Sequence, residues 1–171
     1  MSRQLALVID LDRCIGCLGG CRVACKIENN IALGDSRSKL YTMQSGTYPD
    51  LEMYFLPVMC QQCENPSCAA VCPTGACSKS TEDGVVSIDR DRCVGCQSCK
   101  HACPYGAMNF NEQMRVMDKC DICKPLRDSG EQPACVKNCS GQAIRVVDVG
   151  SEDVTACRQL PDCGNKPMGR Y

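Results

Sequence analysis

Bulky aromatic side chains are almost missing from this sequence. Its 171 residues include no tryptophan, two phenylalanines and five tyrosines, and there is a single histidine. Because such side chains normally fill much of a domain core, something else has to fill the interior here. A lone histidine without patterned partners also excludes a Ser/His/Asp or similar acid–base constellation.

Long apolar runs and an excess of one charge are absent as well. The longest apolar segments are residues 5–9 and a proline-interrupted segment at 55–59, whereas crossing a bilayer takes about 18 apolar residues. Asp10 and Asp12 end the first segment, and no twin-arginine pair precedes it. We therefore expect no membrane span and no secretory signal. The 19 basic and 20 acidic residues argue against nucleic acid or an anionic membrane as the main partner.

Cysteine is the residue in excess. The chain has 19 cysteines, far above average usage, and an odd number excludes a framework in which every cysteine is paired within the chain. Sixteen of them fall into four groups. The groups are Cys14-x2-Cys17-x3-Cys21-x3-Cys25, Cys60-x2-Cys63-x4-Cys68-x3-Cys72, Cys93-x2-Cys96-x2-Cys99-x3-Cys103 and Cys120-x2-Cys123-x11-Cys135-x3-Cys139.

The spacing within these groups favours iron–sulfur ligation. The third group, which Pro104 follows, has the C-x2-C-x2-C-x3-C-P pattern of bacterial ferredoxins, in which the fourth cysteine ligates the neighbouring cluster. A single C-x2-C pair would favour a zinc site or a redox dithiol. Four groups that repeat a C-x3-C tail favour iron–sulfur clusters instead, whereas a structural zinc protein would give a colourless preparation.

An internal repeat supports this interpretation. Residues 9–17 (IDLDRCIGC) and 88–96 (IDRDRCVGC) nearly duplicate each other. In each copy a short strand, expected at 5–9 and at 85–88, runs into an Asp-rich turn and a ligand loop in which glycine lets the backbone approach the cluster. Helical turns are expected at the C-x3-C tails and a strand at 144–149. The predicted fold class is α+β and loop-rich, with the clusters as its core.

A family resemblance rests on three features of the sequence. They are the order of the four groups, their Cys-Pro tails, and the segments KIENN (26–30) and GTYPD (46–50). Over about residues 3–149 the chain resembles the iron–sulfur beta subunits of molybdopterin oxidoreductases of the DMSO reductase family. It is most similar to those of polysulfide, thiosulfate, tetrathionate and arsenate reductases. The resemblance implies two fused pseudo-symmetric 2×4Fe-4S ferredoxin-like domains: residues 1–45 with 110–150, and residues 46–109. Residues 151–171 would be a C-terminal tail.

The resemblance also implies four ligand sets, each with three cysteines of one group and one of its partner group. In the order used below, the first set is Cys14, Cys17, Cys21 and Cys139; the second is Cys120, Cys123, Cys135 and Cys25; the third is Cys60, Cys63, Cys68 and Cys103; the fourth is Cys93, Cys96, Cys99 and Cys72. All four are expected to hold 4Fe-4S clusters, because relatives with a 3Fe-4S centre lack a cysteine at the position of Cys99. Two departures are an extra residue between Cys17 and Cys21, which predicts a reshaped loop, and Ser140 in place of proline.

Several residues near the groups have two interpretations each. Cys77, Cys157 and Cys163 are interpreted as unligated thiols, with an extra metal site or a Cys157–Cys163 disulfide as the alternative. His101 is interpreted as a solvated loop residue, with cluster tuning or quinol proton handling as the alternative. Basic residues that flank the ligands would offset a charge of about −9 on the loaded chain, or are ordinary surface charges. They are Arg13, Lys26, Arg92, Lys100, Lys119 and Lys124.

The chain shows no phosphate-binding loop and no dinucleotide fingerprint, so we expect no active site of its own and no catalytic residue. The resemblance implies a respiratory electron-transfer subunit that connects a molybdopterin catalytic subunit, with Mo or W, to a quinone-linked integral membrane subunit or another redox partner. The alternative is a free-standing cytoplasmic polyferredoxin that serves a hydrogenase or a formate-oxidising enzyme. The resemblance favours the periplasmic side, reached by co-export of the folded chain with the catalytic subunit; permanent cytoplasmic residence is the alternative.

Overall fold

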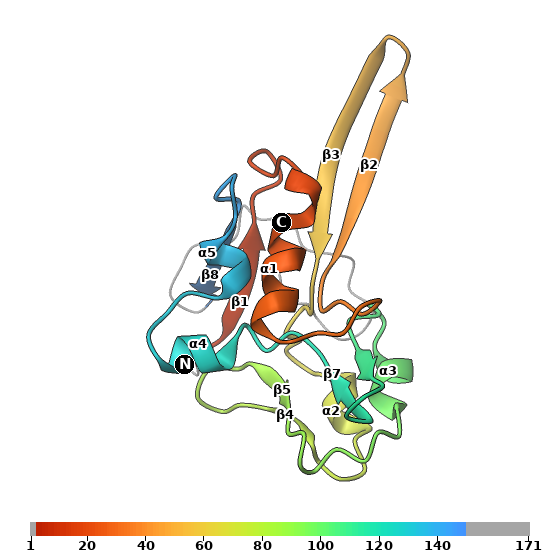
Figure 1. Ribbon diagram of the computed structural model, residues 1–171, viewed down its shortest axis with the longest axis vertical. Coiled ribbons are helices and arrows are strands. Elements are labelled where there is room, and N and C mark those ends of the chain that lie inside the picture. Colours follow the sequence, from red (N-terminus) through yellow and green to blue (C-terminus); the bar gives the residue numbers. More distant parts are fainter. Residues whose placement is uncertain (1–2, 150–171) are drawn as a thin grey trace.

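The structure, a computed structural model, describes residues 3–149 and is built from short elements. Figure 1 shows small helices and hairpins gathered in one body, from which a single long hairpin projects. Within the described range no helix has the length and apolar character to cross a membrane. The tail at 151–171, with Cys157 and Cys163, lies outside the described residues. The elements are β1 (Leu5–Ile9), η1 (Cys17–Gly19), α1 (Gly20–Glu28), β2 (Lys39–Thr47), β3 (Asp50–Val58), α2 (Ser67–Ala70), β4 (Cys77–Lys79), β5 (Val86–Ile88), α3 (Ser98–Ala102), β6 (Asn109–Asn111), β7 (Val116–Asp118), α4 (Lys124–Asp128), α5 (Ala134–Lys137) and β8 (Ile144–Asp148).

The strands of the described residues form four antiparallel two-stranded sheets. β2–β3, β4–β5 and β6–β7 are hairpins between strands that are close in sequence. β1 instead pairs with β8, with Leu5 opposite Asp148 and Ile9 opposite Ile144. The strands expected at 5–9, 85–88 and 144–149 are confirmed as β1, β5 and β8 within a residue or so at their ends. The β1–β8 pairing places the segment before the first cysteine group beside the segment after the fourth.

β1 is buried along its whole length because both of its faces are covered. Successive side chains of a strand point to opposite faces, so Ala6 and Val8 pack with Val147 on one face. The other face contributes to the main core, which contains aliphatic side chains and sulfur but no aromatic ring. Its buried members are Leu5, Leu7, Ile9, Cys21, Met59, Val85, Cys120, Ile122, Cys135 and Ile144.

A second core lies among β4, β5, α3 and the β6–β7 hairpin. Its buried members are Cys77, Val86, Cys99, Met108 and Met117, with Phe110 of β6 packed against them. The division into residues 1–45 with 110–150 and residues 46–109 stays a prediction. Both of its internal boundaries fall inside hairpin strands, because residue 45 lies in β2 and residue 110 lies in β6.

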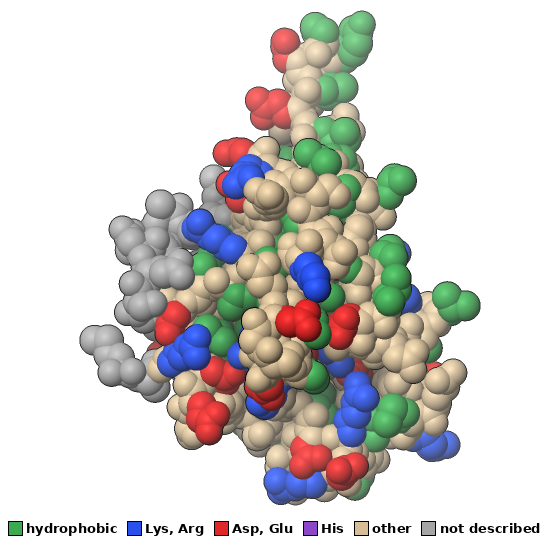
Figure 2. Space-filling view, turned by 60° about the vertical axis from the view of Figure 1, so that its left-hand side comes forward, with side chains coloured by type: hydrophobic (Ala, Val, Ile, Leu, Met, Phe, Trp, Pro, Cys, Tyr) green, Lys and Arg blue, Asp and Glu red, His purple; other side chains and the backbone are tan. Residues whose placement is uncertain are grey.

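The β2–β3 hairpin is the longest element, and the sequence analysis did not anticipate it. Its strands pair from Lys39 opposite Val58 to Thr47 opposite Asp50, and Figure 1 shows it standing away from the body. The runs on either side of the Thr47–Asp50 turn are rich in strand-forming residues, but Pro57 weakens the signal. Hydrophobic side chains line much of the projection in Figure 2. The exposed ones are Tyr41, Met43, Tyr48, Leu51, Met53 and Tyr54.

A buried ion-pair network ties the segment before β2 to the loop at Cys120. Arg37 is 6 % exposed, and its guanidinium donates to both carboxylate oxygens of Asp118 at 2.7 Å and to Asp121 at 3.1 Å. It also donates to the Asn29 side-chain oxygen at 2.7 Å. Burial alone lowers the pKa of Arg37, but the hydrogen bonds and charge of Asp118, with Asp121, raise it overall. The Arg37 guanidinium therefore stays charged and holds the carboxylates of Asp118 and Asp121 in place.

We predict that Arg37→Met lowers the free energy of unfolding by about 3 kcal/mol, because it leaves Asp118 and Asp121 without their buried partner. The measurement is urea denaturation of the protein as isolated, followed by circular dichroism. Lys137→Met is the control, since it removes an exposed pair with Glu131 and should leave the midpoint nearly unchanged. Equal midpoints for the two variants would contradict the prediction.

Candidate metal centres

Each cysteine group begins with a C-x2-C loop, and all four loops share one backbone turn. The residue before the second cysteine has a positive φ in every loop: Gly16 at 71° and Gly95 at 68°, Gln62 at 46° and Ile122 at 55°. This left-handed conformation is ordinary for glycine and uncommon for other residues. A residue in this conformation lets successive backbone N–H groups converge on one point, which suits an anionic centre.

The two glycines occupy equivalent places in the internal repeat, and the structure shows why each is needed. A Cβ added to Gly16 would lie 2.7 Å from the ring of Phe55 on β3. A Cβ added to Gly95 would overlap the carbonyl oxygen of Arg115 and lie 3.3 Å from the ring of Phe110 on β6. In both copies an aromatic ring on a hairpin strand therefore packs directly against the ligand loop.

The other two loops keep the same turn without glycine. Gln62 and Ile122 are each 1 % exposed. Gln62 accepts a hydrogen bond from the Val86 N–H and donates one to the Cys120 carbonyl, both at 2.9 Å, whereas Ile122 packs in the main core. A strained backbone conformation persists where its surroundings fix it in this way. No sequence signal marks these two positions.

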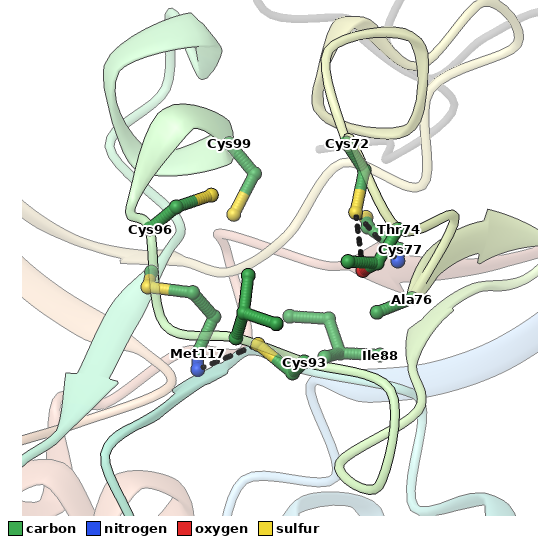
Figure 3. A pocket seen from close by; sticks show the side chains of 10 residues that line it. Cys72, Thr74, Ala76, Cys77, Ile88, Cys93, Cys96, Cys99 and Met117 are labelled. Atoms are coloured by element: carbon green, nitrogen blue, oxygen red, sulfur yellow. Dashed lines mark hydrogen bonds between the residues drawn. The ribbon is translucent and has the colours of Figure 1, made fainter.

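Two of the predicted ligand sets line pockets. The fourth set surrounds about 310 Å³ of open space whose lining also includes Ile88 and Met117. Figure 3 shows Cys96 and Cys99 on one side of it, Cys72 opposite them and Cys93 below. The second set lines a pocket of about 320 Å³ that Arg37 and Met59 also line. Within residues 3–149 no group of three or more His, Cys, Asp or Glu side chains converges closely enough to hold a single metal ion.

The other two sets are brought together as well, because Cys21 and Cys139 of the first set pack in the main core and Cys68 and Cys103 of the third set pack in the second core. Burial raises the pKa of Cys21, and the nearby thiolates of Cys17, Cys139 and Cys14 raise it further. Burial, with the charges of Cys60, Cys68 and Cys103, raises the pKa of Cys63 to about 12. In each case the thiols that raise the pKa include the fourth cysteine of the set, Cys139 or Cys103, which is distant in the sequence. That these cysteines bind iron stays a prediction.

The four sets are linked to one another in a row, because cysteines of the first, second and third sets pack in the main core and cysteines of the third and fourth sets pack in the second core. Burial is the main cause that raises the pKa values of Cys135, Cys120 and Cys99, and in each case a thiolate of the adjacent set adds to it. Cys21 of the first set acts on Cys135 of the second. Cys60 of the third set acts on Cys120 of the second. Cys68 of the third set acts on Cys99 of the fourth, so the order is first, second, third, fourth.

Backbone N–H groups donate to the sulfurs of the C-x3-C tails. Ala107 donates to Cys103 at 3.5 Å and Ala143 donates to Cys139 at 3.2 Å, so each donor lies four residues after the cysteine that accepts. The bond to Cys139 uses the N–H of Ala143, so Ser140 in place of proline leaves it intact. Cys72 accepts a similar bond from the Cys77 N–H at 3.3 Å.

These observations fit an iron–sulfur cluster at each set. All four donors are sulfur, the lining of the two pockets is rich in apolar side chains, and N–H groups point at the sulfurs. Thiolate ligands, hydrogen bonds to sulfur and limited access of solvent are the features that hold such clusters and tune their potentials.

Comparison with known proteins agrees with this geometry. Models of a 4Fe-4S dicluster domain match residues 51–149 and residues 13–76. The chain is 36% identical to the B subunit of the sulfite dehydrogenase of Allochromatium vinosum, over 98% of this chain and 82% of the relative. It is 41% identical to the B subunit of the tetrathionate reductase of Salmonella typhimurium, over 85% of this chain and 58% of the relative.

The chain thus belongs to the iron–sulfur electron-transfer subunits of molybdopterin-type reductases. The B polypeptide of the anaerobic dimethyl sulfoxide reductase of Escherichia coli is a further relative, 37% identical over 90% of this subunit and 76% of the relative. The family resemblance and the ferredoxin-like fold expected from the cysteine groups are thereby confirmed, and so are 4Fe-4S clusters as the cofactor type.

The basic residues that flank the ligands of this subunit differ in their exposure to solvent. Arg13, Arg92, Lys100 and Lys124 are exposed and Lys26 is partly buried, whereas Lys119 is 3 % exposed. His101 is exposed, as expected, but it lies in α3 rather than in a loop. Cys77 is 3 % exposed. A hydrogen bond from its thiol is the main cause that lowers the pKa of Cys68 to about 7.

We predict that Cys139→Ala and Cys14→Ala damage the same centre of the subunit, although the two residues are 125 positions apart in the sequence. Each variant should lose one electron paramagnetic resonance signal and about four iron atoms. Cys135→Ala should affect a different centre, and Cys77→Ala, which alters no predicted ligand, should keep all its iron. The pairing would be wrong if Cys139→Ala and Cys135→Ala lost one identical centre while the Cys14 centre survived.

Proposed function

We propose that this subunit carries four 4Fe-4S clusters and relays electrons between a molybdopterin catalytic subunit and a quinone-linked membrane subunit or another redox partner. The observation that carries the proposal is the row of four cysteine sets, in which cysteines of the first three sets pack in the main core and cysteines of the third and fourth sets pack in the second core. The clusters, when bound, supply one-electron redox chemistry. The thiolates hold them, the N–H donors of the tails offset their negative charge, and the apolar linings limit the access of water.

The two ends of the row differ from its middle in a way that suits docking. The residue after the first cysteine is Ile15 in the first set and Val94 in the fourth, and these side chains are 62% and 66% exposed. The equivalent residue of the third set, Gln61, is 2% exposed, and Asp121 of the second set is partly buried. Exposed aliphatic side chains beside the outer sets are suited to contact with protein partners.

The first-set end offers the larger apolar surface. Leu18 is fully exposed there, and the base of the β2–β3 hairpin adjoins the same loop through Phe55. We assign this end to the catalytic subunit, because permanent interfaces are larger and more hydrophobic than transient ones. The fourth-set end is then left for the second partner.

The coupling between cluster loading and folding bears on the compartment in which the protein works. Because thiolate ligands from opposite ends of the chain must assemble before a cluster is held, loading and folding are coupled. We infer that any export takes place after loading, together with the catalytic subunit, and that the complex works on the periplasmic side.

The expected result for the anaerobically purified subunit is about 16 iron atoms per chain and no turnover of oxyanions or sulfur compounds with an artificial donor. A complex with a Mo- or W-pterin subunit should turn such a substrate over. An iron content near half that value, with zinc in place of the missing iron, would contradict the presence of four clusters. Turnover by the single chain without pterin would contradict the relay, and purification without a partner from native cells would favour a free-standing polyferredoxin.

Ile15→Asp is expected to weaken binding of the catalytic subunit about tenfold, which corresponds to about 1.4 kcal/mol, because it places a charge in an apolar interface. Val94→Asp should leave that binding unchanged and slow electron transfer to the second partner. Co-purification and stopped-flow reduction measure the two effects, with iron content confirming that both variants are loaded. Leu33→Asp, at an exposed position outside both loops, is the control. The same response from both loop variants would contradict the assignment of the ends.

A further inference from the structure

A closed ring of hydrogen bonds lies at the middle of the row. Lys119 Nζ donates to the carbonyl oxygens of Val86 and Cys120, the latter at 2.7 Å. Gln62 spans the same two residues, because its side chain accepts from the Val86 N–H and donates to the Cys120 carbonyl. We call these four residues the junction. Lys119 and Gln62 are 3% and 1% exposed, so the ring is shielded from solvent.

The junction connects the loops of the second and third sets through β5. Lys119 precedes Cys120 of the second set and Gln62 precedes Cys63 of the third. Burial alone lowers the pKa of Lys119, but the charges of Cys60 and Cys120, followed by those of Cys68 and Cys77, raise it overall. Apart from Cys77, the thiols whose charges act on the ammonium belong to both neighbouring sets, Cys120 to the second and Cys60 and Cys68 to the third.

Within residues 3–149 no carboxylate forms an ion pair with Lys119. The acceptors of its Nζ in the junction are neutral carbonyl oxygens. A buried ammonium without a counter-ion costs several kcal/mol. The negative charge that compensates it must therefore come from the sulfur sets on either side.

The loaded sets supply that charge. Four thiolates around an oxidised core of +2 give a net charge of about −2, and one electron makes it about −3. An ammonium in a water-poor interior interacts with such charges far more strongly than an exposed one does. Its attraction to the reduced form exceeds its attraction to the oxidised form, so it favours reduction of the two central clusters.

We propose that Lys119 raises the reduction potentials of the second- and third-set clusters, and that it thereby holds the middle of the row accessible to electrons. The inference rests on the proposed function, since it requires clusters at both sets. One electron arrives from an outer cluster and one leaves to the other side, and the effect requires no proton transfer. Arg13 and Arg92, which flank the outer sets, are exposed, so solvent and salt screen them and they have much smaller effects.

Lys119→Met tests the inference, because it removes the charge and keeps a long side chain in the buried position. Potentials are measured by redox titration of the anaerobic full-length subunit, followed by electron paramagnetic resonance. Two of the four midpoint potentials should become more negative and two should stay unchanged. The unchanged centres should be those altered separately by Cys14→Ser and Cys96→Ser, which mark the outer sets. Lys119→Gln, which keeps a donor for the Cys120 carbonyl, is made in parallel and carries the same expectation.

Two further variants separate charge from structure. Lys124→Met removes an exposed lysine that also adjoins a ligand, Cys123, and should leave all four potentials unchanged. Gln62→Met removes hydrogen bonds of the junction but keeps the ammonium, so its effect should be smaller than that of Lys119→Met. Equal shifts for Gln62→Met and Lys119→Met, or equal shifts of all four centres, would overturn the role of the charge. If the unmodified subunit has four centres and both Lys119 variants keep its potentials, this inference alone is overturned. If the unmodified subunit has fewer than four centres, the result counts against the proposed function.

Discussion

The constraint that shapes the whole structure is the predicted assembly of each sulfur set from cysteines of two distant groups. Cys139 has to reach Cys14, and Cys25 has to reach Cys135, so the ends of the described segment must meet. The β1–β8 pairing brings them together, and the other sheets of the described residues are hairpins that reverse the direction of the chain between one ligand loop and the next. With sulfur sets in both cores, large aromatic side chains are not needed to fill the interior. The clusters that the sets are proposed to hold would cross-link the chain where a larger domain would rely on apolar burial.

Two buried cations sit close to this sulfur interior, and the fold compensates them differently. Arg37 is held by Asp118 and Asp121, so its charge is balanced by carboxylates and its main role is to join two segments. Lys119 has only carbonyl acceptors in its ring and depends on the negative sets around it. A balanced ion pair contributes little field at a distance, whereas an uncompensated ammonium acts on whatever charge lies nearby. This difference is why Lys119, rather than Arg37, is assigned an effect on electron transfer.

The four C-x2-C loops differ according to their position in the row. All four loops keep the left-handed turn, but the residue after the first cysteine is exposed and aliphatic at the two ends and polar in the middle, where Gln61 is buried and Asp121 partly so. The middle loops face each other across the junction, whereas the end loops face outward. The same local motif thus serves contact between sets at the centre and, as proposed, contact with partners at the ends.

The sequence by itself determined the features that depend on short spacings. The cysteine intervals, the duplicated IDxDRCxGC segment and the apolar run of β1 specify the cofactor type, the ligand loops and three of the strands, because each is encoded within a few residues. The tertiary structure alone decided which neighbours of the ligands are buried. Arg13, Arg92 and Lys119 all precede the first cysteine of a group, yet only Lys119 is covered, by β5 and the Gln62 loop. The left-handed turns at Gln62 and Ile122 were likewise hidden, since burial and hydrogen bonds to distant segments hold them, and such long-range contacts leave no local mark in the sequence.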